Sequence, residues 1–138
     1  MQLNFRSANL TDIFQLKALG IASYGRFAPL LSADNQEKLF SFLNNENGWK
    51  ELVQMSHSFV CVNNDNIIGM AFLIPHGNPT DIYPADWSYI RMVGVHPEYT
   101  GKGIGKSLTK MCIDKAKELN ETIISLHTSE FMNSARHI

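Results

Sequence analysis

Hydrophobic and polar positions change their spacing several times along the chain, and each spacing predicts an element. Leu3 and Phe5 alternate with polar neighbours, which predicts a short first strand. Thr11 and Asp12 then offer an N-cap and an acidic first turn, and the positions after them have the period of an amphipathic helix. The apolar stripe of this helix consists of Ile13, Leu16, Gly20 and Tyr24. Two further helical stretches are predicted over residues 32–43 and 49–53, with a polar interruption between them.

The spacing becomes that of strands after residue 57. Residues 58–62 and 67–73 are apolar and contain β-branched side chains, and the polar residues between them tolerate left-handed turns, so an antiparallel hairpin is predicted. A further strand is predicted from Trp87 to Val95 and a helix from Gly103 to about Leu119. Residues 122–126 predict a buried strand, and a last helix is expected to begin at residue 129 or 130. This order predicts one mixed α/β domain over residues 1–138.

Composition excludes several classes of protein. Of the 138 residues, 44% are hydrophobic and 18% are charged, which suffices for a packed core and excludes a disordered chain. No apolar run approaches the roughly 20 residues that cross a bilayer, and the N-terminus lacks the order of a signal peptide. We therefore expect a cytoplasmic protein that has no membrane partner. The formal net charge is −1, without the basic excess of a duplex-DNA binder, so nucleic acid is not an expected partner.

Residues that often carry metal or redox chemistry are scattered. Cys61 and Cys112 both lie inside apolar segments, so we expect buried, reduced thiols. His, Cys, Asp and Glu residues show no spacing typical of a metal site, and no metal is predicted.

The most specific segment runs from Val93 to Leu108 and contains three alternating glycines between a predicted strand and a predicted helix. Glycines remove the Cβ atoms that would block a ligand, so several backbone N–H groups can point at the ligand together. The N-terminus of a helix also favours an anion, and Lys102 and Lys106 add positive charge. The segment therefore predicts a phosphate-binding site around Gly101, Gly103 and Gly105.

Two common phosphate-binding motifs fit this segment poorly. A P-loop requires a glycine five residues before Gly105, where this chain has Thr100. The dinucleotide-binding fingerprint Gly-x-Gly-x-x-Gly has two residues between its last two glycines, whereas only one residue separates Gly103 from Gly105. No early βαβ unit precedes the turn either. A nucleotide-binding P-loop protein stays an alternative, and it would bind ATP more tightly than coenzyme A (CoA).

The sequence Thr100-Gly101-Lys102-Gly103-Ile104-Gly105, which follows a strand and a proline, resembles the GCN5-related N-acetyltransferase (GNAT) family. The coenzyme motif of that family usually reads Arg/Gln-x-x-Gly-x-Gly/Ala, and this chain matches both glycines but begins with threonine. The resemblance extends from about residue 5 to the C-terminus, with residues 126–135 as the fifth strand and fourth helix. It implies a GNAT-like acyl-CoA N-acyltransferase fold, a mixed, mostly antiparallel sheet flanked by helices, here without the last two strands.

The resemblance implies direct transfer of an acetyl group from acetyl-CoA to a primary amine of a small molecule or peptide. In the family the fourth and fifth strands splay apart around the pantetheine arm, and Gly94 suits a bulge or a close approach of the ligand. A backbone N–H near Met92 and Val93 would polarise the thioester carbonyl. The implied cofactor-binding residues are Val93, Gly94, Val95, Thr100, Gly101, Lys102, Gly103, Ile104, Gly105 and Lys106.

The resemblance marks the catalytic acid and base less clearly. Family members often have a glutamate base on the fourth strand, where this chain has Tyr89, and a tyrosine acid on the fourth helix, which would follow Ile138. Tyr89, which could face the core or the cleft, and His127, which could be structural, are the candidate catalytic residues. The alternative function is a catalytically inactive acyl-CoA-binding module or regulatory subunit. The short C-terminus would leave strand five with an unpaired edge, through which two copies could form a homodimer.

Overall fold

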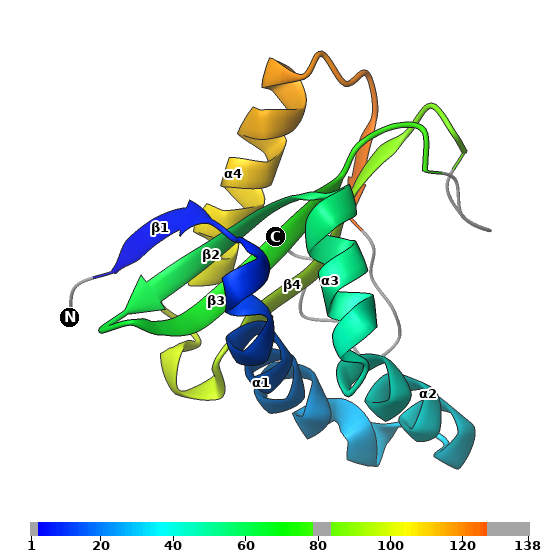
Figure 1. Ribbon diagram of the computed structural model, residues 1–138, viewed down its shortest axis with the longest axis vertical. Coiled ribbons are helices and arrows are strands. Elements are labelled where there is room, and N and C mark those ends of the chain that lie inside the picture. The colour runs from blue at the N-terminus through cyan, green and yellow to red at the C-terminus, as the bar shows by residue number, and fades with distance from the viewer. Residues whose placement is uncertain (1–2, 79–83, 127–138) are drawn as a thin grey trace.

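A five-stranded sheet forms the centre of the computed structural model, which describes residues 3–78 and 84–126 (Figure 1). The strands follow chain order across the sheet: β1 (Asn4–Ser7), β2 (His57–Asn63), β3 (Asn66–Ile74), β4 (Ser88–Val95) and β5 (Ile124–Leu126). Neighbouring strands are antiparallel except β4 and β5, which are parallel. This confirms the predicted mixed, mostly antiparallel sheet, including the hairpin of β2 and β3.

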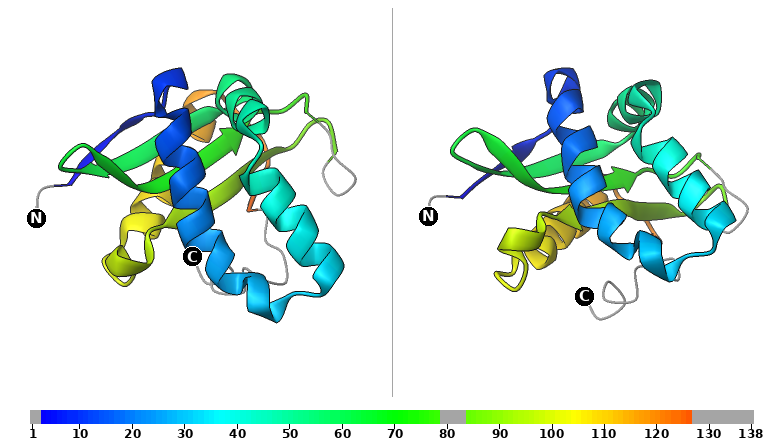
Figure 2. Two further views of the ribbon diagram at one scale, coloured as in Figure 1. Left: turned by 60° about the horizontal axis from the view of Figure 1, so that its bottom comes forward. Right: turned by 90° about the horizontal axis from the view of Figure 1, so that it is seen from below.

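Helices cover both faces of the sheet (Figure 2). One face carries α1 (Ile13–Tyr24), α2 (Ala33–Leu43) and α3 (Glu46–Met55), and the other carries α4 (Ile104–Glu118). Three short 3-10 helices complete the described elements: η1 (Leu10–Asp12), η2 (Gly25–Leu30) and η3 (Pro97–Tyr99). The predicted helices are therefore confirmed where the structure describes them.

The sheet separates two hydrophobic cores. In the core on the face of α1, α2 and α3, the largest side chains that are fully buried are Trp49 and Phe72. On the face of α4, Leu108 and Cys112 pack against β3 and β4. Both cysteines are buried and free, as predicted, and burial raises the pKa of Cys112 to about 12. Its thiol therefore stays protonated and behaves as a core side chain.

α4 lies very close to the sheet at Gly69 of β3. A Cβ at this position would lie 2.8 Å from Cγ2 of Ile104 and 2.9 Å from Cδ1 of Leu108. Only glycine leaves room for both side chains, so the first two turns of α4 rest directly on the β3 backbone. This contact fixes the N-terminal end of α4 relative to β4.

Two predicted details are corrected by the structure, and one prediction is not tested by it. The capping side chain is that of Asn9, at the start of η1: its Oδ1 accepts a hydrogen bond from Thr11 N, and Asp12 Oδ2 accepts one from Asn9 N. Asp12 is the N-cap residue of α1, as predicted, but its side chain makes no cap hydrogen bond to that helix. The strand predicted over 122–126 begins only at Ile124, and that side chain is 36% exposed rather than buried. β5 is the edge strand of the described sheet, which explains its exposure. The expected last helix lies outside the described residues.

A bidentate ion pair between Arg6 and Asp12 joins β1 to the start of α1. Arg6 Nη1 and Nη2 donate to the two carboxylate oxygens of Asp12 at 2.8 and 3.0 Å, and the Asp12 side chain is 7% exposed. The hydrogen bond from Arg6 holds the pKa of Asp12 below its ordinary value, against the opposing effect of burial. Since the folded-state pKa is the lower one, the pair stabilises the fold above the unfolded pKa of roughly 4, and that stabilisation is lost as the pH falls through the folded-state value.

The variant Asp12→Asn is expected to lower the free energy of unfolding by about 1–3 kcal/mol at neutral pH, because Arg6 loses a charged partner. The difference from the wild-type protein should shrink as the pH falls below about 4, because the Asp12 carboxyl is protonated first in the unfolded chain and only at lower pH in the folded protein. Urea denaturation of both proteins across this pH range measures the effect. A difference that stays constant down to about pH 2 would contradict the assignment.

Candidate functional site

The glycine-rich turn between β4 and α4 is open on its outer side. Gly101 and Gly103 have φ angles of +80° and +78°, in the left-handed region that favours glycine. A Cβ on either residue would meet no atom within 4 Å. Both residues are exposed, and Gly103 is also the N-cap residue of α4. The turn therefore leaves space for a ligand directly above its backbone.

The backbone N–H groups of this turn have no hydrogen-bond acceptor among the described residues. Within residues 3–78 and 84–126, no hydrogen bond is donated by the backbone N–H groups of residues 101–106. The first backbone bond of α4 runs from Ser107 N to Gly103 O at 3.0 Å. Unpaired N–H groups at the positive end of a helix form an anion-binding site.

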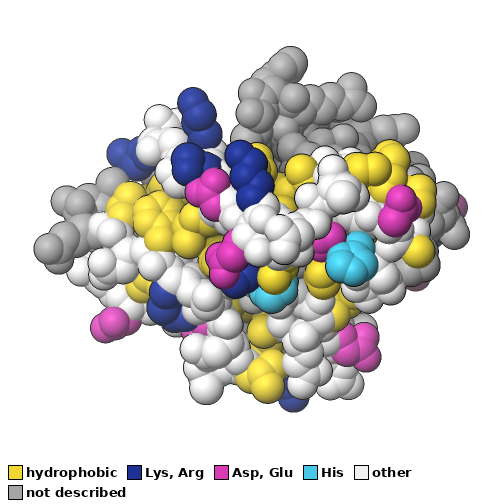
Figure 3. Space-filling view, turned by 90° about the horizontal axis from the view of Figure 1, so that it is seen from above, with side chains coloured by type: hydrophobic (Ala, Val, Ile, Leu, Met, Phe, Trp, Pro, Cys, Tyr) yellow, Lys and Arg dark blue, Asp and Glu magenta, His cyan; other side chains and the backbone are white. Residues whose placement is uncertain are grey.

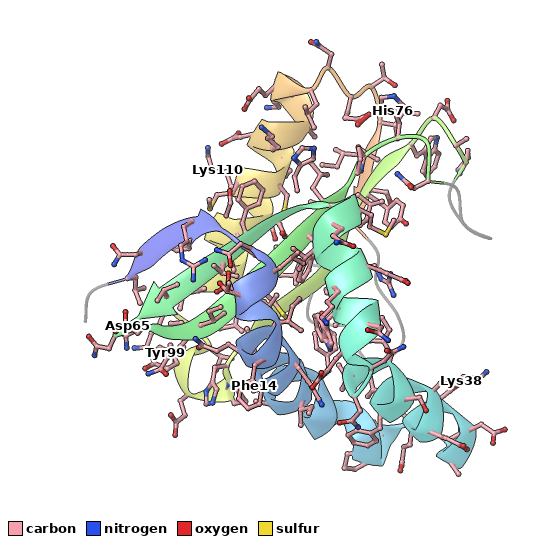
Figure 4. All side chains as sticks on the ribbon, in the orientation of Figure 1. Phe14, Lys38, Asp65, His76, Tyr99 and Lys110 are labelled. Atoms are coloured by element: carbon pink, nitrogen blue, oxygen red, sulfur yellow. The ribbon has the colours of Figure 1, made fainter. Side chains whose placement is uncertain are left out.

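η3 holds the turn in place from its N-terminal side. Tyr99 N donates to His96 O at 2.8 Å, and Asn63 Nδ2 of β2 donates to the Tyr99 hydroxyl at 2.9 Å (Figure 4). The Thr100 hydroxyl donates to Pro97 O at 3.0 Å. Thr100, where the GNAT motif has Arg or Gln, thus stabilises the turn from within.

Positive charge near the turn comes from lysines that lack an acidic partner. Lys and Arg side chains gather over α4 in Figure 3, where Lys110 pairs with Asp114 at 2.7 Å and Lys115 with Glu118 at 3.3 Å. Such exposed pairs contribute little to stability. Lys102 and Lys106 are exposed and form no ion pair with any described residue. Their charge is available to a bound anion.

β4 contains a bulge just before the turn. The register between β3 and β4 shifts so that Ala71 lies opposite two residues, Met92 and Val93. Met92 has a φ of +56°, in the left-handed region that a methionine rarely adopts. The Tyr24 hydroxyl, at the end of α1, donates to Val93 O at 2.9 Å and so holds the bulged backbone.

The space that a side chain at Gly94 would take is filled by neighbouring side chains of the protein. A Cβ here would lie 2.9 Å from Oγ of Ser23 and 3.0 Å from Cε of Met70, because α1 crosses β4 at this residue. The sequence favoured Gly94 as a bulge or as a close approach to a ligand. The structure corrects the first of these, since the bulge comes at Met92 and Val93.

Among the described residues, the edge of β4 is open beside the bulge. The described part of β5 ends at Leu126, which lies opposite Ile90. Among the residues that the structure describes, no strand pairs with residues 91–95 on that side. This open edge leads directly to the glycine turn, and Gly105 lies next to it: a Cβ on Gly105 would be 3.5 Å from Cγ2 of Val95. The structure thus places residues 93–95 of the strand edge next to residues 100–106 of the glycine turn.

In the described structure, neither of the two candidate catalytic residues is found beside the open edge of β4 or the glycine turn. Tyr89 is 4% exposed and belongs to the core beneath α1 and α3. His127 lies outside the described residues. In the described ranges, no group of His, Cys, Asp and Glu residues could hold a metal ion, and no helix is long and apolar enough to cross a membrane.

Sequence reasoning missed two side chains that lie beside the bulge. Tyr24 was assigned only to the apolar stripe of α1, and its partner Val93 is 69 residues away in sequence. Arg91 stacks over a ring of α2, with its Cζ 5.0 Å from the centre of the Phe42 ring. Neither residue lies in a recognisable motif, and only the tertiary fold places them next to the open edge.

Comparison with known proteins gives a family and a fold. Residues 25–137 match the sequence profile of the acetyltransferase (GNAT) family. Among the curated proteins, none is significantly similar to this chain. Solved structures share the fold at low identity. PaiA N-acetyltransferase from Thermoplasma acidophilum, in complex with coenzyme A, is 16% identical with a TM-score of 0.80, over 99% of this chain and 86% of that one.

Two further solved structures have the same fold over 99% of this chain and 87% of each other chain. One is a predicted acetyltransferase with acetyl-CoA from Clostridium acetobutylicum, 21% identical with a TM-score of 0.67. The other is a ribosomal-protein-alanine N-acetyltransferase from Brucella melitensis, 17% identical with a TM-score of 0.69. These similarities bear out the fold class that the glycine motif implied.

Proposed function

The chain belongs to the GNAT acetyltransferase family, and we propose that it transfers an acetyl group from acetyl-CoA to a primary amine of a small molecule or peptide. The observation that carries this proposal is the set of backbone N–H groups at residues 101–106 that have no acceptor among the described residues. Two structurally similar proteins are described with CoA and with acetyl-CoA, which supports the choice of ligand.

The turn and the strand edge would bind different parts of acetyl-CoA. The N–H groups of residues 101–106, with the ammonium groups of Lys102 and Lys106, would bind the diphosphate. The open edge of β4 at residues 91–95 would pair with the pantetheine arm, as an additional strand would. This path leads from the diphosphate to the bulge, so the thioester would lie next to Met92 and Val93.

At the bulge, the fold supplies positioning and stabilisation of charge. A backbone N–H of Met92 or Val93 would donate to the thioester oxygen, which becomes negative as the amine nitrogen attacks the carbonyl carbon. The carbon–sulfur bond then breaks, the nitrogen loses a proton, and the CoA sulfur gains one. His127 and Tyr89 stay the candidates for the base, and Tyr89, which is 4% exposed, would have to become accessible to touch an acceptor.

The variant Tyr24→Phe tests the role of the bulge. Loss of the bond to Val93 O should loosen the bulge and lower kcat by about tenfold, whereas the Kd of acetyl-CoA, set mainly at the glycine turn, stays within about twofold. Burial raises the pKa of the Tyr24 hydroxyl far above its ordinary value, so wild-type and variant should have pH profiles of the same shape.

Ser23→Ala is the matched control for this prediction. It removes a buried hydroxyl from the preceding residue of α1, and among the described residues that hydroxyl bonds only within its own helix, to Leu19 O at 2.8 Å. Its kcat should match that of the wild-type protein. If Tyr24→Phe keeps full kcat, or if both variants lose it equally, Tyr24 does not position the reacting groups.

Release of CoA from acetyl-CoA in the presence of an amine panel tests the function itself. We expect release that depends on an amine and an acetylated product of matching mass. Binding of acetyl-CoA without turnover of any amine would instead support an inactive acyl-CoA-binding module. Tighter binding of ATP than of CoA in calorimetry would support the P-loop alternative.

A further inference from the structure

Arg91 lies on β4, directly before the bulge. It follows Ile90, which pairs with Leu126, the last described residue of β5. The bulge at Met92 and Val93 comes next. Arg91 is therefore adjacent in sequence to the backbone N–H that the proposed function assigns to the thioester oxygen.

The Arg91 side chain is held on the face of α1 and α2. Its Cζ lies 5.0 Å from the centre of the Phe42 ring, on α2. Stacking on an aromatic ring fixes the plane of a guanidinium but leaves its charge and its N–H donors available. The positive charge of Arg91 also acts on Tyr24, since it opposes the larger effect by which burial raises the pKa of that hydroxyl. Tyr24 and the Phe42 ring beneath Arg91 belong to the hydrophobic core on one face of the sheet, so Arg91 and Tyr24 lie on the same face.

The charge of Arg91 has no acidic partner in the described part of the chain. The ion pairs found there involve Arg6, Lys17, His76, Lys110 and Lys115, and none involves Arg91. The residue is nevertheless half-buried. A cation that is partly removed from water without a counterion is costly, and a bound anion would offset that cost.

We propose that Arg91 binds an anionic group, a carboxylate or a phosphate, on the amine acceptor, so that the substrates of this chain are amines that carry a negative charge. This inference rests on the proposed acetyl transfer. The planar guanidinium donates two parallel hydrogen bonds to either kind of anion. With the anion held there, the amine of the same molecule lies beside the bulge, where the thioester is attacked.

Matched pairs of acceptors test the inference with the full chain. β-Alanine is compared with β-alaninamide, and phosphoethanolamine with ethanolamine, by kcat/KM at saturating acetyl-CoA. We expect the anionic member of at least one pair to be preferred by about 10- to 100-fold, and the pair that shows the preference identifies the group as carboxylate or phosphate. Equal kcat/KM within both pairs would overturn the inference and leave the acetyl transfer intact.

Two variants of Arg91 connect that preference to the residue. Arg91→Gln should abolish the preference and raise KM for the anionic acceptor, with the Kd of acetyl-CoA unchanged, and Arg91→Lys should restore part of the preference. Lys38→Gln is the control of equal charge change, because Lys38 is exposed on α2 (Figure 4). A preference that survives in Arg91→Gln would overturn the role of Arg91. No turnover of any amine, with acetyl-CoA bound, would overturn the proposed function and this inference together.

Discussion

Replacement of Gly103 by valine is expected to weaken the binding of CoA by at least about 100-fold while the protein stays folded. A Cβ at this residue would point into open space, where no protein atom lies within 4 Å. In the proposed complex the diphosphate occupies that space, so a branched side chain would separate it from several N–H groups. Each lost charged hydrogen bond is worth about 1.5–3 kcal/mol. Calorimetric titration with CoA measures the loss.

Gly77→Val is the matched control for this variant. Gly77 follows β3, has a φ of +93°, and has no atom within 4 Å of a Cβ built on it. Both substitutions therefore place a valine in the left-handed region, at a cost to stability of about 1–2 kcal/mol or more each. Only Gly103→Val should lose CoA binding. An unchanged Kd in Gly103→Val, or an equal loss in both variants, would remove the glycine turn from the site.

Trp49→Ala is expected to lower the free energy of unfolding by about 3–5 kcal/mol. Trp49 is fully buried, and its ring centre lies 5.7 Å from that of Phe42 and 6.1 Å from that of Phe72. Its Nε1 donates to Leu43 O at 3.0 Å, which fixes the turn between α2 and α3. A Cβ on Gly20 of α1 would lie 2.7 Å from Cζ2 of Trp49, so the indole also sets the position of α1. Alanine would leave a cavity where three helices meet the sheet.

Phe14→Ala provides the comparison for Trp49→Ala in urea denaturation. Phe14 lies on α1 and is 79% exposed (Figure 4). Its removal should change the free energy of unfolding by no more than about 0.5 kcal/mol. A typical domain is stable by only about 5–15 kcal/mol, so the loss at Trp49 would be a large part of the total. Equal effects of the two substitutions would contradict the placement of Trp49 in the core.

Sequence pattern predicted those elements whose signal is local. The hairpin of β2 and β3 has apolar strands on both sides of a polar turn, and α4 has a regular apolar stripe that begins directly after the glycine turn. The cap of the first helical segment was predicted only in part, because the segment begins with a 3-10 turn that Asn9 caps before Asp12 begins α1. The exposure of Ile124 depends on the position of β5 in the sheet, which its apolar composition does not reveal.

In the candidate site, too, features of the local backbone could be predicted from the sequence, whereas features that depend on tertiary contacts could not. Alternating glycines predict an open turn because the lack of a Cβ is a property of glycine itself, and a Cβ on Gly101 or Gly103 would indeed meet no atom within 4 Å. The bulge was expected at Gly94 and lies at Met92 and Val93, whereas Gly94 itself lies where α1 brings Ser23 close to β4. Tyr24 and Arg91 could not be found from sequence, since their roles arise from contacts between distant segments.

A titration of isotope-labelled protein with CoA, followed by the NMR signals of its backbone amides, tests the central claim most directly. Residues 101–106 should show the largest shifts, together with residues 91–95, and the shifts should saturate at one CoA per chain. Gly77 and its loop serve as the internal reference. Saturable binding that leaves the amides of 101–106 unchanged, or no binding of CoA at all, would contradict the account.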